Sequence, residues 1–455
     1  MIRKFGLYFS GLVLALMLPA CEKNVDIEPP TAIDAAAGFS TRQDVDAALV
    51  GCYNSLQSPN YHGLRFFLFG DLYTDNVIHT GTFPSFAQIA NKAILPDNVE
   101  VTNMWNQAYS GINRCNNVIA SAPNISDPAF NNAAAVAEAR CLRAFHYMSL
   151  LSYFGGSETG FNKGGGLGLP IIQRPTLSPA DAAPQARATE DDVWTFILAD
   201  LDNAIANLPN AVGTGRLNKR AATALKARAH LYRGEWAAAE AAANEVITTG
   251  GYTLVPGATY TDLYLKKNSS EAIWELQFDA NNTNQIAFFF YPTSAGGRNE
   301  VSASAGLRTA HTAGDVRLPV NVIAAGSLAN KTQKYSRIAG DDNVIMVRLA
   351  EMYLIRAEAR LAQNKVTEAL EDLNVITARA NSGAETSTDV ATILDRIVLE
   401  RRLEFAHEGA HRYFDLRRLN RLSTIGITQT FRNLWPLPQR EVLTSEGVIT
   451  QNPGY

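Results

Sequence analysis

The sequence lacks a strong excess of charge of either sign. Its 455 residues contain 40 Lys and Arg against 44 Asp and Glu, which gives a formal net charge of −4. Such a chain has no positive field to attract phosphates, so the composition argues against nucleic-acid binding. It also lacks a Pro/Ser-rich linker or charge block, although single cores usually stop growing beyond about 250 to 300 residues. We therefore expect a helical scaffold that carries an inserted subdomain.

Cysteine is scarce. The chain has four cysteines, of which Cys52, Cys115 and Cys141 follow Cys21. Three is an odd number, and all three lie in apolar helical patterns, which favours buried free thiols over a disulfide framework. One bridge remains open in an oxidising compartment.

Long apolar runs are absent after Cys21, and the one apolar stretch lies before it. A short positive region precedes the stretch from Phe5 to Leu18, and Ala20 stands directly before Cys21. The stretch is too short to cross about 30 Å of hydrocarbon as a stable helix. We expect residues 1–20 to be a cleaved signal peptide and Cys21 to be acylated, which anchors the protein to a membrane. The alternative is an ordinary secreted protein with an incidental cysteine.

Two segments, 220–247 and 349–379, have the pattern of tetratricopeptide-like helical pairs. Each has two alanines twelve residues apart with a helix-ending residue between them: Ala227, Gly234 and Ala239, then Ala357, Asn364 and Ala369. Small Ala side chains allow two helices to cross closely, and Gly or Asn accepts the left-handed conformation that ends the first helix. Neither pair is stable alone, so other helices must stack against them. Candidates are 42–56, 101–122, 133–154 and 189–208, the last with an N-terminal capping box formed by Thr189 and Asp192.

Two segments interrupt the helical pattern. Residues 252–334 are rich in Gly, Asn, Thr and Ser, with apolar bursts at 272–278 and 286–292 that favour strands and loops over helices. We place a ligand-binding subdomain there. Residues 155–188 separate two helices that would otherwise form one pair, and their glycines lack the strand-before, helix-after setting of a phosphate loop. A flexible connection or a partner contact fits this insertion better.

The last hundred residues contain an Ala-rich helical pair from Arg348, an Arg/Glu-rich helix from Glu400 and an aromatic-Pro tail from Leu434. This order and spelling resemble the C-terminal half of the SusD/RagB family of outer-membrane nutrient-binding lipoproteins. The resemblance implies a mainly α fold with four tetratricopeptide-like pairs in one body, 21–455. We divide that body into a helical scaffold, 21–251, the inserted subdomain, 252–334, and a C-terminal helical pair with an extended tail, 335–455.

The resemblance also implies a function. Members of this family capture nutrients at the cell surface without changing them and pass them to a TonB-dependent outer-membrane transporter, above which they sit as a lid. We therefore expect an outer-membrane, lipid-anchored protein that faces the exterior and that has no catalytic activity, cofactor or metal. The expected ligand is an oligosaccharide, with a peptide as in RagB-like members as the alternative. A tetratricopeptide scaffold that binds only protein partners is a further alternative.

Loop aromatics are the candidate ligand contacts, because sugar rings stack on aromatic faces while carboxylates and amides bind their hydroxyls. The five tryptophans lie in helical, strand-like or tail patterns and are poor platforms. The candidates in irregular segments are Tyr61, Asp75, Asn76, Phe83, Phe86, Tyr291 and Arg298.

One short motif suggests a different function. His407, Glu408 and His411 match the H-E-x-x-H pattern of zinc metalloproteases. On a helix that begins at Leu394, Glu408 faces the core and both histidines face away from it, which is the reverse of the protease geometry. Gly409 tends to end a helix between the two ligands, so we interpret the stretch as a structural turn.

An arginine nearby calls for a structural partner. Arg401 lies on the apolar face of the same predicted helix, where an unpaired cation costs several kcal/mol. We therefore expect a buried ion pair with Glu351, Glu358 or Glu408.

Overall fold

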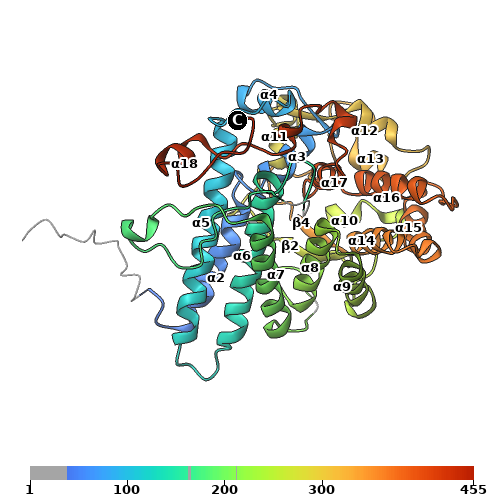
Figure 1. Ribbon diagram of the computed structural model, residues 1–455. Coiled ribbons are helices and arrows are strands. Elements are labelled where there is room, and N and C mark those ends of the chain that lie inside the picture. Colours follow the sequence, from blue (N-terminus) through green and yellow to red (C-terminus); the bar gives the residue numbers. More distant parts are fainter. Residues whose placement is uncertain (1–37, 162–164, 212) are drawn as a thin grey trace, which may run out of the picture. The chain divides into compact units, whose positions relative to one another are not determined.

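Helices dominate the computed structural model, which describes residues 38–161, 165–211 and 213–455 (Figure 1). The signal peptide expected at 1–20 and the acylation expected at Cys21 lie outside the described residues. Residues 41–455 form one compact unit. The larger helices are α2 (Arg42–Gln57), α5 (Val99–Ser121), α6 (Asn132–Phe154), α7 (Glu190–Asn207), α8 (Lys219–Arg233), α9 (Trp236–Thr249), α14 (Leu349–Ala362), α15 (Val366–Ala380) and α16 (Val390–Glu404). None of the described helices is long and apolar enough to cross a membrane.

The large helices pack in pairs along the chain: α2 with α5, α6 with α7, α8 with α9, and α14 with α15 (Figure 1). Helix α5 also packs on α6, and α9 on α14, so the pairs stack on one another. The predicted helical-pair scaffold is confirmed. The predicted N-terminal cap at Thr189 is present as well. Its Oγ1 accepts a hydrogen bond from the Asp192 N–H at 3.1 Å, directly before α7 begins.

The alanines of the two predicted pairs lie where the helices meet. Ala227, Ala239, Ala357 and Ala369 are all fully buried. Gly234 has φ +70° and Asn364 has φ +60°, so both adopt the left-handed conformation expected between the paired helices. Two of the alanines join a core that contains Leu and Ile side chains from α14, α15 and α16, together with Phe405 just after α16.

Short elements fill the rest of the described chain. The short helices are α3 (Arg65–Tyr73), α4 (Pro84–Ala90), α10 (Asp262–Leu265), α11 (Ile286–Phe290), α12 (Ala305–Ala310), α13 (Leu318–Asn321), α17 (His411–Arg418) and α18 (Gln439–Thr444). Two antiparallel strand pairs accompany them: β1 (Val77–His79) with β3 (Val301–Ala303), and β2 (Ala272–Leu276) with β4 (Val344–Arg348).

The prediction for the two apolar bursts was half right. The first burst forms β2, as expected. The second forms helix α11, so the expectation of a strand or loop there was wrong. The helix buries Ile286, Ala287, Phe289 and Phe290 together, which a strand with alternating faces does not do.

The tail and the cysteines follow the sequence analysis. Trp435 is fully buried, and its backbone N–H donates to Tyr153 O at 2.9 Å, so the tail crosses the end of α6. The thiols of Cys52, Cys115 and Cys141 are free and buried. The prediction of buried free thiols is confirmed.

A network of buried charges joins the C-terminal helices to the inserted segment. Arg348 Nη1 lies 2.8 Å from Glu271 Oε1 and 2.5 Å from Glu404 Oε1, and its Nε lies 2.9 Å from Glu408 Oε2. Arg379 also contacts Glu404. All these side chains are at most 5 % exposed, so each charge is offset only by its neighbours.

Arg401 is part of a second buried pair. Its Nε lies 2.7 Å from Asp415 Oδ2. The predicted structural ion pair is therefore confirmed, but the predicted partners were wrong. Glu351 instead pairs with Arg228, and Glu358 with Arg418.

Candidate functional site

The H-E-x-x-H segment does not form the helix that a zinc protease site needs. Helix α16 ends at Glu404, and His407, Gly409 and Ala410 all have positive φ. His407 and His411 are buried, so the expectation that they face away from the core was wrong. Glu408 faces the core as predicted, where it is held by Arg348 and by Lys334 Nζ at 2.5 Å. The segment is a buried turn whose glutamate is already paired.

His407 instead takes part in a buried polar cluster with Asp71. The backbone N–H of His407 donates to Asp71 Oδ2 at 2.6 Å, and the side-chain amide of Asn76 donates to Asp71 Oδ1 at 3.0 Å. Burial raises the pKa of Asp71 to about 7, against the lowering effect of these hydrogen bonds. Burial also lowers the pKa of His407 to about 3, so its imidazole is neutral at physiological pH.

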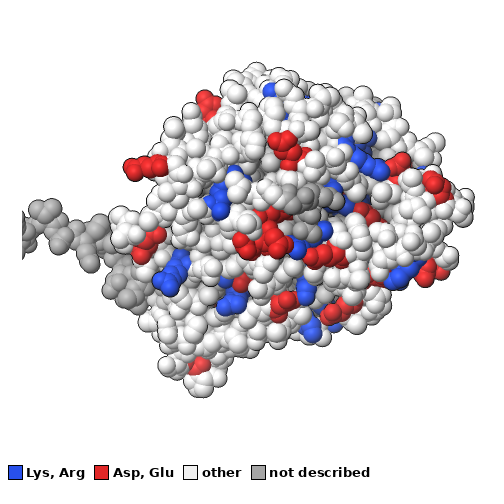
Figure 2. Space-filling model, viewed as in Figure 1, with Lys and Arg blue, Asp and Glu red and all other residues white. Residues whose placement is uncertain are grey.

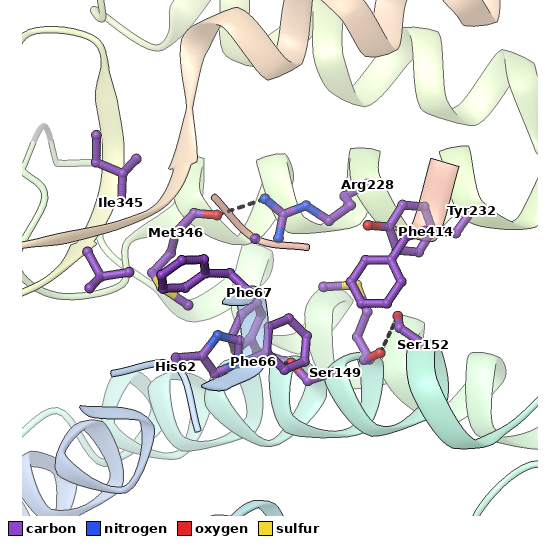
Figure 3. A pocket seen from close by; sticks show the side chains of 14 residues that line it. His62, Phe66, Phe67, Ser149, Ser152, Arg228, Tyr232, Ile345, Met346 and Phe414 are labelled. Atoms are coloured by element: carbon purple, nitrogen blue, oxygen red, sulfur yellow. Dashed lines mark hydrogen bonds between the residues drawn. The ribbon is translucent and has the colours of Figure 1, made fainter. Parts of the chain in front are cut away.

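A cavity inside the helical body is too small for a nutrient. Figure 3 shows its lining, in which Phe66, Phe67 and Phe414 crowd the space and Arg228 donates to Met346 O at 2.7 Å. The space open to water centres is about 20 Å³. That volume holds about one water molecule, so the cavity has no room for a sugar ring.

Several predicted ligand contacts are buried in the protein itself. Tyr61 is 1 % exposed and stacks on His146 at 5.6 Å between ring centroids. Phe86 is fully buried and stacks on Phe289 at 5.7 Å. Tyr291 is buried as well, and burial raises its pKa to about 12. The expectation that these rings offer a free face was wrong.

Asn76 is not free either. Its amide nitrogen donates to Asp71, and its oxygen accepts from Arg402 Nε at 2.9 Å. Asp75 is different, because its carboxylate is 30 % exposed while it pairs with Arg412 at 2.8 Å and Arg402 at 3.1 Å. Burial raises the pKa of Asp75, but the two arginines outweigh it and leave the pKa below its usual value. This anion keeps its charge at the surface.

The fold brings Phe83 and Arg298 into contact, although they lie far apart in the sequence. The guanidinium carbon of Arg298 lies 3.8 Å from the centroid of the Phe83 ring. Glu300 Oε2 accepts from Arg298 Nε at 3.0 Å, and Glu300 Oε1 accepts from the Phe83 N–H at 2.7 Å. The same Oε1 atom lies 2.9 Å from His79 Nε2. These bonds join the end of β1, the residue before α4 and the residues that lead into β3.

Phe288 supplies the exposed ring of this region. It is 39 % exposed, and it is the only aromatic side chain in the described parts of the chain that exceeds about a third. Its ring lies edge-to-face on the buried Phe289, at 5.8 Å, and the Arg298 N–H donates to Phe288 O at 2.7 Å. Phe289 in turn lies 6.2 Å from Phe83. Phe288 and Arg298 thus belong to one surface, which we call the Phe288 face.

A cleft of about 520 Å³ opens at the same strand pair. Its lining includes His79, Asp75, Lys92, Asn91 and Ile78. His79 links the cleft to the Phe288 face through its contact with Glu300. The volume lies within the range of small-molecule sites, and the lining offers a carboxylate, an ammonium and an amide around an apolar floor. Such a set of groups can bind the hydroxyls of a neutral, polar ligand.

Comparison with known proteins places the chain in a family. A family model described as "SusD family" matches residues 319–455. A second model, described as "Starch-binding associating with outer membrane", matches residues 23–231. The chain belongs to the SusD/RagB family. The resemblance seen in the last hundred residues is therefore confirmed, and the second match extends it to the N-terminal half.

Three proteins similar to this SusD/RagB member align over nearly their whole length. SusD-like protein P38 of Formosa agariphila is 26 % identical, over 100 % of this chain and 99 % of the relative. A solved SusD superfamily protein from Bacteroides thetaiotaomicron is 26 % identical and matches with a TM-score of 0.78, covering 91 % of this chain and 100 % of that chain. A solved laminarin-binding SusD-like protein is 22 % identical, has a TM-score of 0.76, and covers 92 % of this chain and 100 % of its own.

The sequence analysis did not select Phe288, although this residue lies in the apolar burst at 286–292. A strand would place Phe288 and Phe290 on one face and Phe289 on the other. Helix α11 instead turns Phe288 outward and buries its two neighbours. The one signal in the sequence was the helical spacing of the run Ile-Ala-Phe-Phe-Phe, which places Phe288 on the side opposite the other four residues.

Proposed function

We propose that this SusD/RagB protein captures an oligosaccharide at the cell surface on the Phe288 face and in the adjoining cleft. The observation that carries the proposal is the exposure of Phe288 next to a fixed arginine and carboxylate. Leaving a phenylalanine ring in water forgoes its burial energy, and a sugar ring covers such a face with its apolar side. The charged and amide groups of the cleft then bind the sugar hydroxyls.

The comparisons support a glycan as the class of ligand. One matching family model is described as starch-binding, and one solved structure of the same fold is a laminarin-binding protein. Those two polymers differ in linkage, so neither name selects a sugar for this chain. The interspersed charges in Figure 2 fit a neutral ligand, because neither sign forms a continuous field on the face shown.

The protein acts at the outer membrane in this proposal. The family model's description includes association with the outer membrane, and the N-terminal sequence has the pattern of a lipoprotein signal that ends at Cys21. Acylated Cys21 holds the protein on the exterior surface, and a TonB-dependent transporter receives the glycan beneath it. The protein binds and releases its ligand without chemical change.

A peptide is the competing candidate ligand. Binding measurements with a panel of oligosaccharides and a panel of peptides distinguish the two candidates. Full-length protein purified in detergent is applied to an array of neutral oligosaccharides and to a library of short peptides. We expect binding to at least one glycan and to no peptide. Binding to peptides alone contradicts the proposed ligand class while leaving the family assignment intact.

The partner is tested on membranes. Chemical cross-linking of cells that carry the protein, followed by its isolation, is expected to yield a large outer-membrane transporter in equal amount. Isolation of the protein alone, or with periplasmic proteins only, contradicts the delivery step.

A further inference from the structure

A groove separate from the cleft at the Phe288 face opens between α5, the 155–188 insertion and α18. It has a volume of about 430 Å³. An adjoining groove of about 430 Å³ shares Ile172, Asp181 and Gln185 with it, so the two are continuous. Each lies within the range of about 300 to 1,000 Å³ that is typical of ligand sites. Side chains from three distant stretches of sequence converge here, which surface roughness alone does not require.

The floor of this groove, which we call the α5 groove, contains a half-buried tyrosine that is held in place. The Tyr109 hydroxyl donates to Pro170 O at 2.9 Å. Its ring lies 4.9 Å from that of Trp105 with a 44° tilt, and its edge faces Tyr147 at 6.4 Å. The exposed part of the ring is therefore pre-organised, so a ligand does not have to order it on binding.

The wall of the groove is fixed as well. The side-chain amide of Asn116, on α5, donates to the carbonyls of Ile172 at 2.9 Å and Arg174 at 3.2 Å. Asn113 Oδ1 accepts from the Thr176 N–H at 2.8 Å. The insertion was expected to be a flexible connection or a partner contact, and these bonds show that residues 172–176 are tied to α5. Long irregular segments held in this way are frequently functional.

Three polar side chains at the rim of the α5 groove have no hydrogen-bond partner within the described parts of the protein. In the described ranges, the side chains of Asn106, Gln185 and Glu441 make no hydrogen bond or ion pair with another residue. Asp181 is different, because its carboxylate accepts from the Ser178 hydroxyl at 2.8 Å. Two amides and one carboxylate around a fixed ring offer donors and acceptors to hydroxyl groups on both sides of an apolar floor.

We propose that the α5 groove is a second saccharide-binding site. Tyr109 stacks on a sugar ring, and Asn106, Gln185 and Glu441 bind its hydroxyls. The inference that the ligand is a saccharide rests on the proposed function. It adds that a long glycan is held at two points, the Phe288 face and the α5 groove. The second contact is then intramolecular, so a polymer binds more tightly than a short oligosaccharide without any new kind of contact.

Hydrogen exchange on full-length protein in detergent locates the second site. The probes are maltoheptaose, laminarihexaose, soluble starch and laminarin. The polymer that binds is expected to slow exchange in residues 170–185, and this protection is expected to persist in Phe288→Ala. Polymer binding with no protection of 170–185 overturns the inference. Protection of that segment by a peptide library instead of by glycans overturns its saccharide class.

A double variant tests the rim. Asn106→Ala with Gln185→Ala is expected to weaken polymer binding by about tenfold, equivalent to about 1.4 kcal/mol. The matched control is Gln43→Ala with Asn54→Ala on α2, where both side chains are exposed and lie outside the groove. Its polymer affinity is expected to equal that of wild type. Equal affinities of the two double variants overturn the inference.

The same measurements separate the two proposals. Loss of short-oligosaccharide binding in Phe288→Ala, with the rim variant unchanged toward the polymer, leaves the proposed function standing and removes only the second site. If none of the four glycans binds the wild type, the result contradicts both saccharide sites, the Phe288 face and the α5 groove.

Discussion

The buried charge network gives a prediction whose size follows from the structure. Glu404 is inaccessible to solvent, and its carboxylate contacts Arg348 at 2.5 Å, Arg317 at 3.3 Å and Arg379. Burial raises the pKa of this carboxyl, but the three arginines outweigh it and hold the pKa below its usual range. Replacement by glutamine keeps the shape and removes the charge, so three buried cations lose a partner.

Glu404→Gln is expected to lower the free energy of unfolding by about 3 to 5 kcal/mol, the usual cost of breaking a buried pair from one side. Residues 41–455 make a body of 415 residues. With an unfolding entropy of about 2.1 cal/mol/K per residue the total is about 0.9 kcal/mol/K, so Tm falls by roughly 3 to 6 °C. Thermal melts followed by circular dichroism measure this change.

The control for this experiment is Glu371→Gln on α15, an exposed glutamate outside the network. Surface substitutions of this kind usually change stability by less than about 0.5 kcal/mol. If Glu404→Gln melts within error of Glu371→Gln, the carboxylate does not balance the arginines and the reasoning is refuted.

Three further predictions concern the anchor, the helix crossings and pH. Cys21→Ser is expected to move the protein from the membrane fraction to the soluble fraction, and its retention there would contradict acylation at this residue. Ala227→Leu and Ala357→Leu are each expected to cost about 1 to 3 kcal/mol through overpacking, measured as a lower denaturant midpoint; unchanged midpoints would show that the crossings have room. The folded-state pKa of Asp71, about 7, lies above its unfolded value, so the stability that its protonated form contributes at low pH is lost as pH rises through about 7. Asp71→Asn is therefore expected to gain stability relative to wild type between pH 4 and pH 8, and a constant difference across that range would refute the assignment.

Local patterns predicted the scaffold well, because its signals lie within single helices. The twelve-residue spacing of Ala357 and Ala369 and the left-handed Asn364 between them are readable without any knowledge of distant contacts. The same holds for the cap of α7 at Thr189. The Arg/Glu-rich helix was also recognised, but its end was misplaced. His407 and Ala410 adopt positive φ, which non-glycine residues rarely do and which the buried contacts around them enforce.

The site was harder to predict because burial there depends on contacts across the chain. Tyr61 looks like a loop aromatic in sequence, yet it packs on His146, 85 residues away. Phe83 and Arg298 lie 215 positions apart in the chain, yet the Arg298 guanidinium stacks on the Phe83 ring and Glu300 binds both residues. A single sequence identifies the segments that carry candidate rings, but it does not show which ring remains exposed.

Titration of the Phe288→Ala variant tests the central claim most directly. The glycan bound by wild type on the array is titrated calorimetrically, in its shortest binding form, into wild type, Phe288→Ala and the control Phe130→Ala. Phe130 is a partly exposed ring in the turn between α5 and α6, outside the proposed site. Because one stacked aromatic contributes about 1 to 3 kcal/mol, Phe288→Ala is expected to weaken binding by roughly 5- to 150-fold, with Phe130→Ala unchanged. Equal affinities for all three folded proteins would contradict glycan capture on the Phe288 face.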